Sequence, residues 1–408
     1  MDNLAPELID AIVELLRLPN GRLDQTSLKS CCLVASAFRE PCQRRILQYL
    51  EMSCEEENAS GGKLTLARVA ACLARSPHLA SYVTKLYVWV VPRDKASRWD
   101  EGFPAELLGR LTNVRVCELV CAYVDICWND LPVGFSAAVL DWLTLQRGTM
   151  RVLGIYDQMA DIPLPALHRI FAAAPKLRLE TSTMEQGPVQ LSDVLIAAEG
   201  LPVILQDLTL VDDPFTAALV RHPGFARYFR NLRSVVLSEP FATLPLLSLA
   251  AGTLECLELR YEDLHRRGNS PPFTFPHLPR LSQLTIAGLM IGLGGPQSPP
   301  GAYERSRASL TTLGLNIPSL THITFQILTH FTARLIQHHP TTCPCLVPAA
   351  GLGQLDDVLS AHPTLTAVRV TLQDAGEVKD IHFNGFEASL KTAFAKVVAK
   401  GMLEVKFE

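Results

Sequence analysis

The residues best suited to bind a metal ion are four histidines and cysteines, His338, His339, Cys343 and Cys345. Two imidazoles and two thiolates are ligands that Zn²⁺ accepts in a tetrahedral site. Structural zinc sites, however, usually space their cysteines as Cys-x2–4-Cys, and adjacent histidines seldom bind one ion. The pattern therefore favours a turn with buried thiols, and we expect no metal site.

Two glycine-containing segments fall short of a nucleotide-binding loop. The segment 61–65, Gly-Gly-Lys-Leu-Thr, lacks the upstream glycine of a phosphate-binding loop and has Leu64 where magnesium requires Ser or Thr. The Gly-Leu-Gly-Gly segment at 292–295 lies in a proline-rich stretch, 288–301, that is typical of a flexible exposed loop. We therefore expect no cofactor.

General acid–base catalysis needs titratable groups held together in one site. The adjacent carboxylates Asp212-Asp213 and Asp356-Asp357 follow or begin predicted elements, where such residues commonly cap helices or face solvent. The chain contains neither a Gly-x-Ser-x-Gly nor a His-Glu-x-x-His motif. We predict no catalytic residue and expect that the protein is not an enzyme. An enzyme whose active site these motifs do not reveal is the remaining alternative.

Composition limits the possible partners and compartments. The 408 residues are 48% hydrophobic with a net charge of −4, which suits a large core or a solenoid and argues against general nucleic-acid binding. The N-terminus has no basic signal-peptide region, and no apolar run approaches the roughly 20 residues that span a bilayer. The 11 cysteines have no regular spacing, so we read them as reduced. We expect an intracellular protein, cytoplasmic or nuclear, that binds no membrane.

The first fifty residues predict three short helices. Pro6 suits the first turn of a helix, and Leu8 and Ile12 belong to an apolar pattern with helical spacing. We expect Ser27 to cap the second helix and Pro41 to limit it, with a third helix beginning near Cys42. Helices this short bury little surface alone, so they either cap the following domain or offer an apolar face to a partner.

These residues resemble an F-box, the module that binds a ubiquitin-ligase adaptor. The family opens with Leu-Pro-x-Glu-Leu; Leu4, Glu7 and Leu8 match that opening, with the proline one place later at Pro6. Matches to the family's first two helices follow at Ile12, Leu16, Leu28, Leu33, Val34 and Phe38, with Phe38 in place of the usual Trp. The resemblance is confined to residues 1–50 and is of the kind found in F-box-like proteins abundant in fungi.

The resemblance implies that the N-terminal module binds a Skp-family adaptor and, through it, a cullin. The residues that would line this hydrophobic contact are Leu4, Pro6, Leu8, Ile12, Leu33, Val34 and Phe38. Some of them must instead hold the helices together, and the sequence does not separate the two roles.

Beyond a polar segment at 51–63, interpreted as a linker, the pattern apolar-x-x-apolar-x-apolar recurs. Its copies begin at Val83, Leu111, Met150, Leu205, Leu232, Leu254, Leu281, Leu320 and Leu365, with a weaker copy at Ala174. Neighbouring copies start 22 to 45 residues apart, a spacing that favours leucine-rich repeats with insertions. A proline turn often precedes the predicted strand, and a helix-like stripe often precedes the turn.

The predicted fold class is α/β. A short three-helix F-box-like module (1–50) and a linker (51–63) are followed by an irregular leucine-rich-repeat-like α/β solenoid (64–408). We expect a further helix near 189–201, a loop near 288–301 and a terminal helix near 386–399. The regular Asn or Cys after each strand is missing, so an ordinary α/β domain is the alternative.

By this resemblance the protein is a non-catalytic, substrate-recognition adaptor of an SCF-type (Skp–cullin–F-box) ubiquitin ligase. The module would bind the Skp-family adaptor, and the array would bind a protein substrate that the sequence does not identify. The alternative is a leucine-rich-repeat scaffold with no link to ubiquitin. Whether substrate binding needs phosphorylation stays open.

Overall fold

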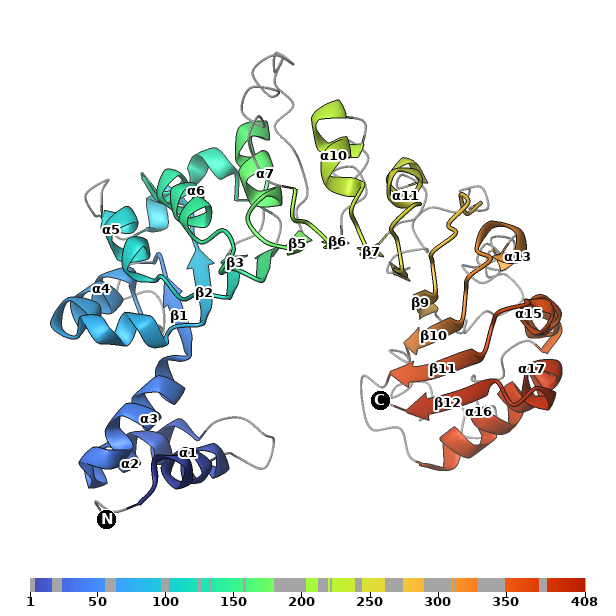
Figure 1. Ribbon diagram of the computed structural model, residues 1–408, viewed down its shortest axis with the longest axis horizontal. Coiled ribbons are helices and arrows are strands. Elements are labelled where there is room, and N and C mark those ends of the chain that lie inside the picture. The colour runs from blue at the N-terminus through green and yellow to red at the C-terminus, as the bar shows by residue number, and fades with distance from the viewer. Residues whose placement is uncertain are drawn as a thin grey trace. The chain divides into compact units, whose positions relative to one another are not determined.

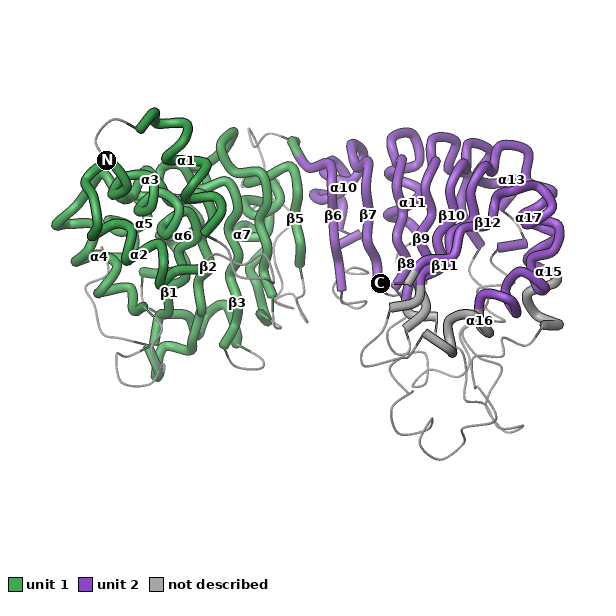
Figure 2. The backbone as a smooth tube through the Cα atoms, turned by 90° about the horizontal axis from the view of Figure 1, so that it is seen from below, with its two compact units in different colours: residues 1–204 green, residues 205–408 purple. Residues whose placement is uncertain are grey.

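The computed structural model describes residues 4–16, 24–55, 64–96, 103–122, 126–132, 134–156, 159–179, 203–211, 219–220, 222–238, 244–260, 274–289, 310–311, 313–328, 349–373 and 380–407. The chain divides into two compact units, residues 1–204 and 205–408 (Figure 2). Both are mixed α/β, and their strands pair in parallel in the order of the chain. The α/β class is therefore confirmed.

Unit 1 begins with three helices, α1 (Pro6–Leu15), α2 (Gln25–Val34) and α3 (Ser36–Leu47) (Figure 1). Pro6 occupies the first turn of α1, as predicted. The cap of α2 is Asp24 and not Ser27: its carboxylate accepts the backbone N–H groups of Thr26 and Ser27, each at 3.1 Å. Ser27 lies inside the helix and donates its hydroxyl to the same carboxylate at 2.6 Å.

The boundary between the second and third helices differs from the prediction. Helix α2 ends before Ala35, whose backbone is extended (φ −150°, ψ 146°). Helix α3 begins at Ser36 and continues through Pro41. An interior proline costs a helix roughly 3 kcal/mol. Phe38 and Cys42, on either side of Pro41, are both buried, so burial of this helix face offsets the cost.

Among the described residues of unit 1, helices cover one face of the sheet and none covers the other face (Figure 1). Its strands are β1 (Tyr49–Ser53), β2 (Lys85–Val90), β3 (Val116–Cys121), β4 (Val152–Tyr156) and β5 (Lys176–Leu179). Its helices and 3₁₀ turns are α4 (Leu66–Arg75), η1 (Pro77–Tyr82), η2 (Arg93–Lys95), α5 (Phe103–Arg110), η3 (Trp128–Asp130), α6 (Phe135–Leu145) and α7 (Leu164–Phe171).

Within unit 1, the strand pattern of the sequence is confirmed with one shift and one omission. Leu86 pairs with Cys117, so the second copy begins at Val114 and not at Leu111. Cys117 and Leu119 are its buried strand positions. This frame was missed because Leu111, Val114 and Val116 fit the same apolar pattern. The omission is β1, which pairs with β2 and whose Leu50 and Met52 are buried.

The expected linker at 51–63 is therefore corrected. Residues 51–53 complete β1, and Glu55 forms an isolated bridge with Ala96. Residues 56–63 lie outside the described residues. Only Gln48 separates α3 from β1, so the repeat array begins directly after the third helix.

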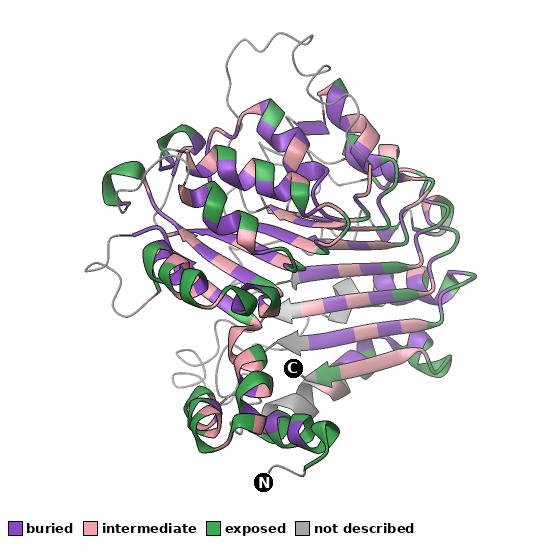
Figure 3. Cartoon of the chain, turned by 60° about the vertical axis from the view of Figure 1, so that its left-hand side comes forward, coloured by how far each residue is buried: buried purple, intermediate pink, exposed green. Residues whose placement is uncertain are grey.

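Unit 2 repeats the same helix, turn and strand order. Its strands are β6 (Asp207–Leu210), β7 (Ser234–Leu237), β8 (Cys256–Arg260), β9 (Gln283–Leu289), β10 (His322–Leu328), β11 (Ala367–Gln373) and β12 (Leu403–Phe407). Its helices are η4 (Pro223–Phe225), α10 (Ala226–Phe229), α11 (Leu244–Ala250), α13 (Leu313–Asn316), α15 (Ala349–Ala361), α16 (Asp380–Ala393) and α17 (Ala395–Ala399). Buried and partly exposed residues alternate along the strands (Figure 3).

The C-terminal prediction was incomplete. The single helix expected near 386–399 is two helices, α16 and α17, which part at Phe394 (φ −102°, ψ 42°). β12 then pairs with β11 along the edge of the sheet. The pattern search missed β12 because its first position is Lys400. The predicted helix at 189–201 lies outside the described residues, and of the predicted loop at 288–301 only the first two residues are described, as the end of β9.

Candidate functional site

The N-terminal helices share a small core of their own. Ile9, Val13, Leu28, Phe38 and Cys42 pack together, and Leu16 and Ile46 are among the partly buried residues around them. Phe38, one of the seven predicted partner contacts, thus holds the helices together and offers little surface to another protein.

The other predicted contact residues all lie on the surface: Leu4, Pro6, Leu8, Ile12, Leu33 and Val34. Leu33 and Val34, at the end of α2, are 88% and 70% exposed. Of the eleven exposed large hydrophobic residues in the described part of the chain, six lie between Leu4 and Val34. Single exposed aliphatic residues are ordinary, but such a concentration within three short helices marks a surface suited to a partner.

Helix α1 carries two parallel apolar stripes. Ile9, Val13 and Leu16 follow i, i+4, i+7 spacing and face the module core. Leu8, Ile12 and Leu15 have the same spacing one residue earlier, and all three are exposed. We call the second set the free stripe. At about 25 cal/mol per Å² of apolar area, covering this stripe would favour association by several kcal/mol.

An ion pair fixes the orientation of α1 on α3. The Arg45 guanidinium donates to Glu14 at 2.6 Å and to the Gln48 side chain at 2.9 Å. The polar face of α1 is thereby tied to α3 while the free stripe stays exposed. At the start of α2, the Ser27 hydroxyl, helped by backbone N–H groups, lowers the pKa of Asp24, which stabilises this cap as a carboxylate.

The third helix also contacts the first repeat. The Gln48 carbonyl accepts N–H groups from Thr84 at 3.1 Å and Lys85 at 2.9 Å. The Arg44 guanidinium lies over the Tyr82 ring, 5.9 Å from its centroid. Helix α3 therefore joins the module to the array through backbone and side-chain contacts.

Most of the other chemical candidates fall outside the described residues. These are the histidines and cysteines at 338–345, the glycines at 61–62 and 292–295, and the pair Asp212-Asp213. Within the described residues, no group of three or more His, Cys, Asp or Glu is placed to hold a metal ion. No helix in that part of the chain is both long enough and apolar enough to cross a bilayer.

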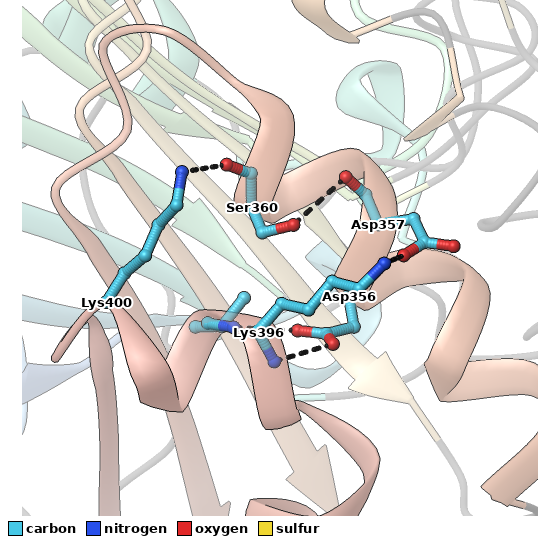
Figure 4. A network of polar contacts seen from close by, with 6 residues as sticks. Asp356, Asp357, Ser360, Lys396 and Lys400 are labelled. Atoms are coloured by element: carbon cyan, nitrogen blue, oxygen red, sulfur yellow. Dashed lines mark hydrogen bonds and ion pairs between the residues drawn. The ribbon is translucent and has the colours of Figure 1, made fainter.

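The Asp356-Asp357 pair has a structural role. Asp356 is buried, and its carboxylate accepts the backbone N–H groups of Lys396 and Val397, each at 2.8 Å (Figure 4). It thus caps α17 from α15, while the exposed Asp357 forms an ion pair with the Lys396 ammonium. Neither carboxylate is arranged as half of an acid–base pair.

Sequence reasoning missed two features of the module. Leu15 belongs to the apolar helical pattern of the sequence but was not counted among the partner contacts, although its i+7 spacing from Leu8 was visible. The Arg45–Glu14 pair joins residues 31 positions apart and left no local signal. A comparison with models of known protein families finds none that matches this chain, and no curated protein sequence matches it either.

Proposed function

We propose that the N-terminal helices form an F-box-like module that binds a Skp-family adaptor. The protein would then be a non-catalytic substrate-recognition subunit of an SCF-type ubiquitin ligase. The observation that carries this proposal is the free stripe of α1, which is exposed while the neighbouring stripe of Ile9, Val13 and Leu16 packs against the module core.

The burial pattern agrees with the resemblance at six of the seven predicted contacts and disagrees at Phe38. Leu8 and Ile12 match the family's apolar positions and are exposed, whereas Phe38 matches and is buried. The proposed adaptor contact is therefore Leu4, Pro6, Leu8, Ile12, Leu15, Leu33 and Val34. An apolar helical face inserted into a partner's groove is a common mode of recognition.

In this proposal the mechanism is proximity. A substrate on the array is tethered near a ubiquitin-charged enzyme, which raises its effective concentration there. The irregular leucine-rich-repeat-like solenoid would follow α3 without an intervening linker, as the contacts at Gln48 and Tyr82 favour. A direct junction restricts the positions a bound substrate can take relative to the adaptor.

The test is adaptor binding by the full chain, measured by calorimetry with a purified fungal Skp-family adaptor. We expect Leu8→Ala combined with Ile12→Ala to weaken binding about a hundredfold, since each truncated interface anchor costs roughly 1–2 kcal/mol. Leu145→Ala is the matched control, because Leu145 on α6 is 74% exposed and lies outside the module. Equal binding by both variants would contradict the proposal.

A specific observation also favours the second candidate, a leucine-rich-repeat scaffold whose N-terminal helices only cap the array. Helix α3 already packs on η1 and hydrogen-bonds at the start of β2, as a cap would. Two results together would support the scaffold: the unmodified chain does not bind the adaptor, and deletion of residues 1–47 destabilises the array.

A further inference from the structure

The open face of the unit 1 sheet carries an ordered row of side chains. Strand register aligns Glu51, Tyr87, Glu118, Gly154 and Arg178 on β1 to β5. Glu51, Tyr87, Glu118 and Arg178 are partly exposed between buried neighbours, whereas Gly154 is itself buried. Because side chains alternate along a strand, the row faces away from the side of the sheet that the helices cover. Adjacent members stand about 4.8 Å apart, the spacing between paired strands.

Aromatic rings gather at the first strands of this row. The Tyr87 ring lies 5.3 Å from the Trp89 ring, edge to face, and 6.4 Å from the Tyr49 ring. The Trp89 indole N–H donates to Glu51 at 2.7 Å. Rings held by neighbours bind a partner with little loss of conformational freedom, which is why Tyr and Trp dominate binding hot spots.

Gly154 leaves room in the row for a further aromatic ring, that of Tyr156. A Cβ at Gly154 would lie 2.5 Å from the Tyr156 ring, so this ring lies where a side chain at 154 would be. The Tyr156 hydroxyl accepts a hydrogen bond from Arg178 at 3.4 Å, which holds the ring there. Glu118 is consequently flanked by Tyr87 on β2 and by the Tyr156 ring over β4.

The Glu118 carboxylate has no hydrogen-bond or ion-pair partner among the described residues, although it is only partly exposed. Burial, with the nearby carboxylates of Glu51 and Glu118, raises the pKa of Tyr49, as expected where the local potential is negative. A carboxylate between two aromatic rings is complementary to an alkylammonium or guanidinium group.

We propose that Glu118, Tyr87 and Tyr156 form a binding site for a lysine or arginine side chain of an extended protein segment. This inference extends the proposed function by naming the chemistry of the substrate segment that the array binds. A cation here would lie beside both rings and pair with the carboxylate.

Cations bordering the site limit what it accepts. Lys85 precedes Tyr87 by two residues on β2, and Arg178 lies beyond Tyr156 on β5. Both would repel the flanks of a long basic tract. The site is therefore suited to one or two basic residues within an otherwise neutral or mixed segment.

The test is selection of a random twelve-residue peptide display library on the full-length chain, without adaptor. We expect peptides containing Arg or Lys to be enriched, and Glu118→Gln to weaken a selected peptide about tenfold, the loss of one charge-assisted contact. Glu255→Gln, which removes an exposed carboxylate in unit 2, is the matched control and should bind normally.

Gly154→Ala provides a second variant, because the added Cβ meets only the outer end of the Tyr156 ring and displaces it. It should weaken the same peptide without lowering the melting temperature. Enrichment of acidic peptides, no enrichment, or equal binding by the Glu118→Gln and Glu255→Gln variants would overturn the inference. Adaptor binding by the Glu118→Gln variant, measured separately, tells whether the proposed function fails with it.

Discussion

Leu8 and Ile9 are neighbours in α1 with opposite environments. Ile9 is 6% exposed and packs in the module core, whereas Leu8 is 54% exposed and belongs to the free stripe. One helix therefore separates the residues that stabilise the module from the residues available to a partner. This separation makes stability and binding independently measurable.

Ile9→Ala should destabilise the module, and Leu8→Ala should not. Truncating a buried Ile to Ala costs about 2–4 kcal/mol through lost burial and a residual cavity. An exposed Leu loses little, so we expect a change below about 0.5 kcal/mol. Urea unfolding followed by circular dichroism checks both values; comparable losses in the two variants would mean that Leu8 is packed in solution.

The junction between module and array gives a second prediction. Arg44 over the Tyr82 ring should contribute about 0.5–1 kcal/mol, the range of an exposed cation–π contact. Arg44 also pairs with Glu40 one turn earlier, so a single substitution cannot isolate the contact. A double-mutant cycle of Arg44→Ala and Tyr82→Leu isolates it, and additive effects on unfolding would show that the contact contributes nothing.

Much of the array could be predicted because its strands alternate in burial. In β8, for example, Leu257 and Leu259 are both buried on the side of the sheet that the helices cover. Positions on that side therefore take apolar residues, which the sequence pattern reveals. The frame failed at β3, where Cys117 occupies a buried position usually taken by a branched aliphatic residue. The pattern failed at β12 because its first position, which is apolar in the predicted copies, is Lys400. The Lys400 ammonium donates to the Ser360 carbonyl.

The helical module was predictable in kind but not in boundaries. Pro41 is an obvious helix breaker, yet the core contributed by Phe38 and Cys42 outweighs its local cost. Leu8 was among the predicted partner contacts and Ile9 was not, but the sequence did not separate contact residues from residues that hold the helices together. Both lie on the wide apolar arc of α1, and only the packing of α3 decides which part of the arc is covered.

Alkaline conditions should weaken the module through Cys42. Burial, with smaller contributions from Cys32 and Cys31, raises the pKa of this thiol from 9.0 to about 12. Between these values the unfolded chain releases a proton that the folded chain keeps. The stabilisation is therefore complete below pH 9 and is lost as the pH rises toward 12.

The measurement is the free energy of unfolding at several pH values between 8.5 and 10.5. Cys42→Ala should reduce the decline by at most about 1.4 kcal/mol per pH unit, the value for one proton. Comparing slopes removes the constant cost of the substitution itself. Identical slopes for the original chain and the Cys42→Ala variant would show that the thiol ionises equally in both states.

The adjacent residues Asp356 and Asp357 should differ sharply in their effect on unit 2. Asp356 accepts two backbone N–H groups at the start of α17 and is 4% exposed (Figure 4). Replacement by Ala therefore leaves the buried Val397 donor and the partly buried Lys396 donor without this partner. We expect Asp356→Ala to cost about 2–3 kcal/mol. Asp357 makes an exposed ion pair with Lys396, so Asp357→Ala should cost less than about 0.5 kcal/mol. Urea unfolding of the full chain measures both; equal losses would show that the cap supplied by Asp356 does not stabilise α17.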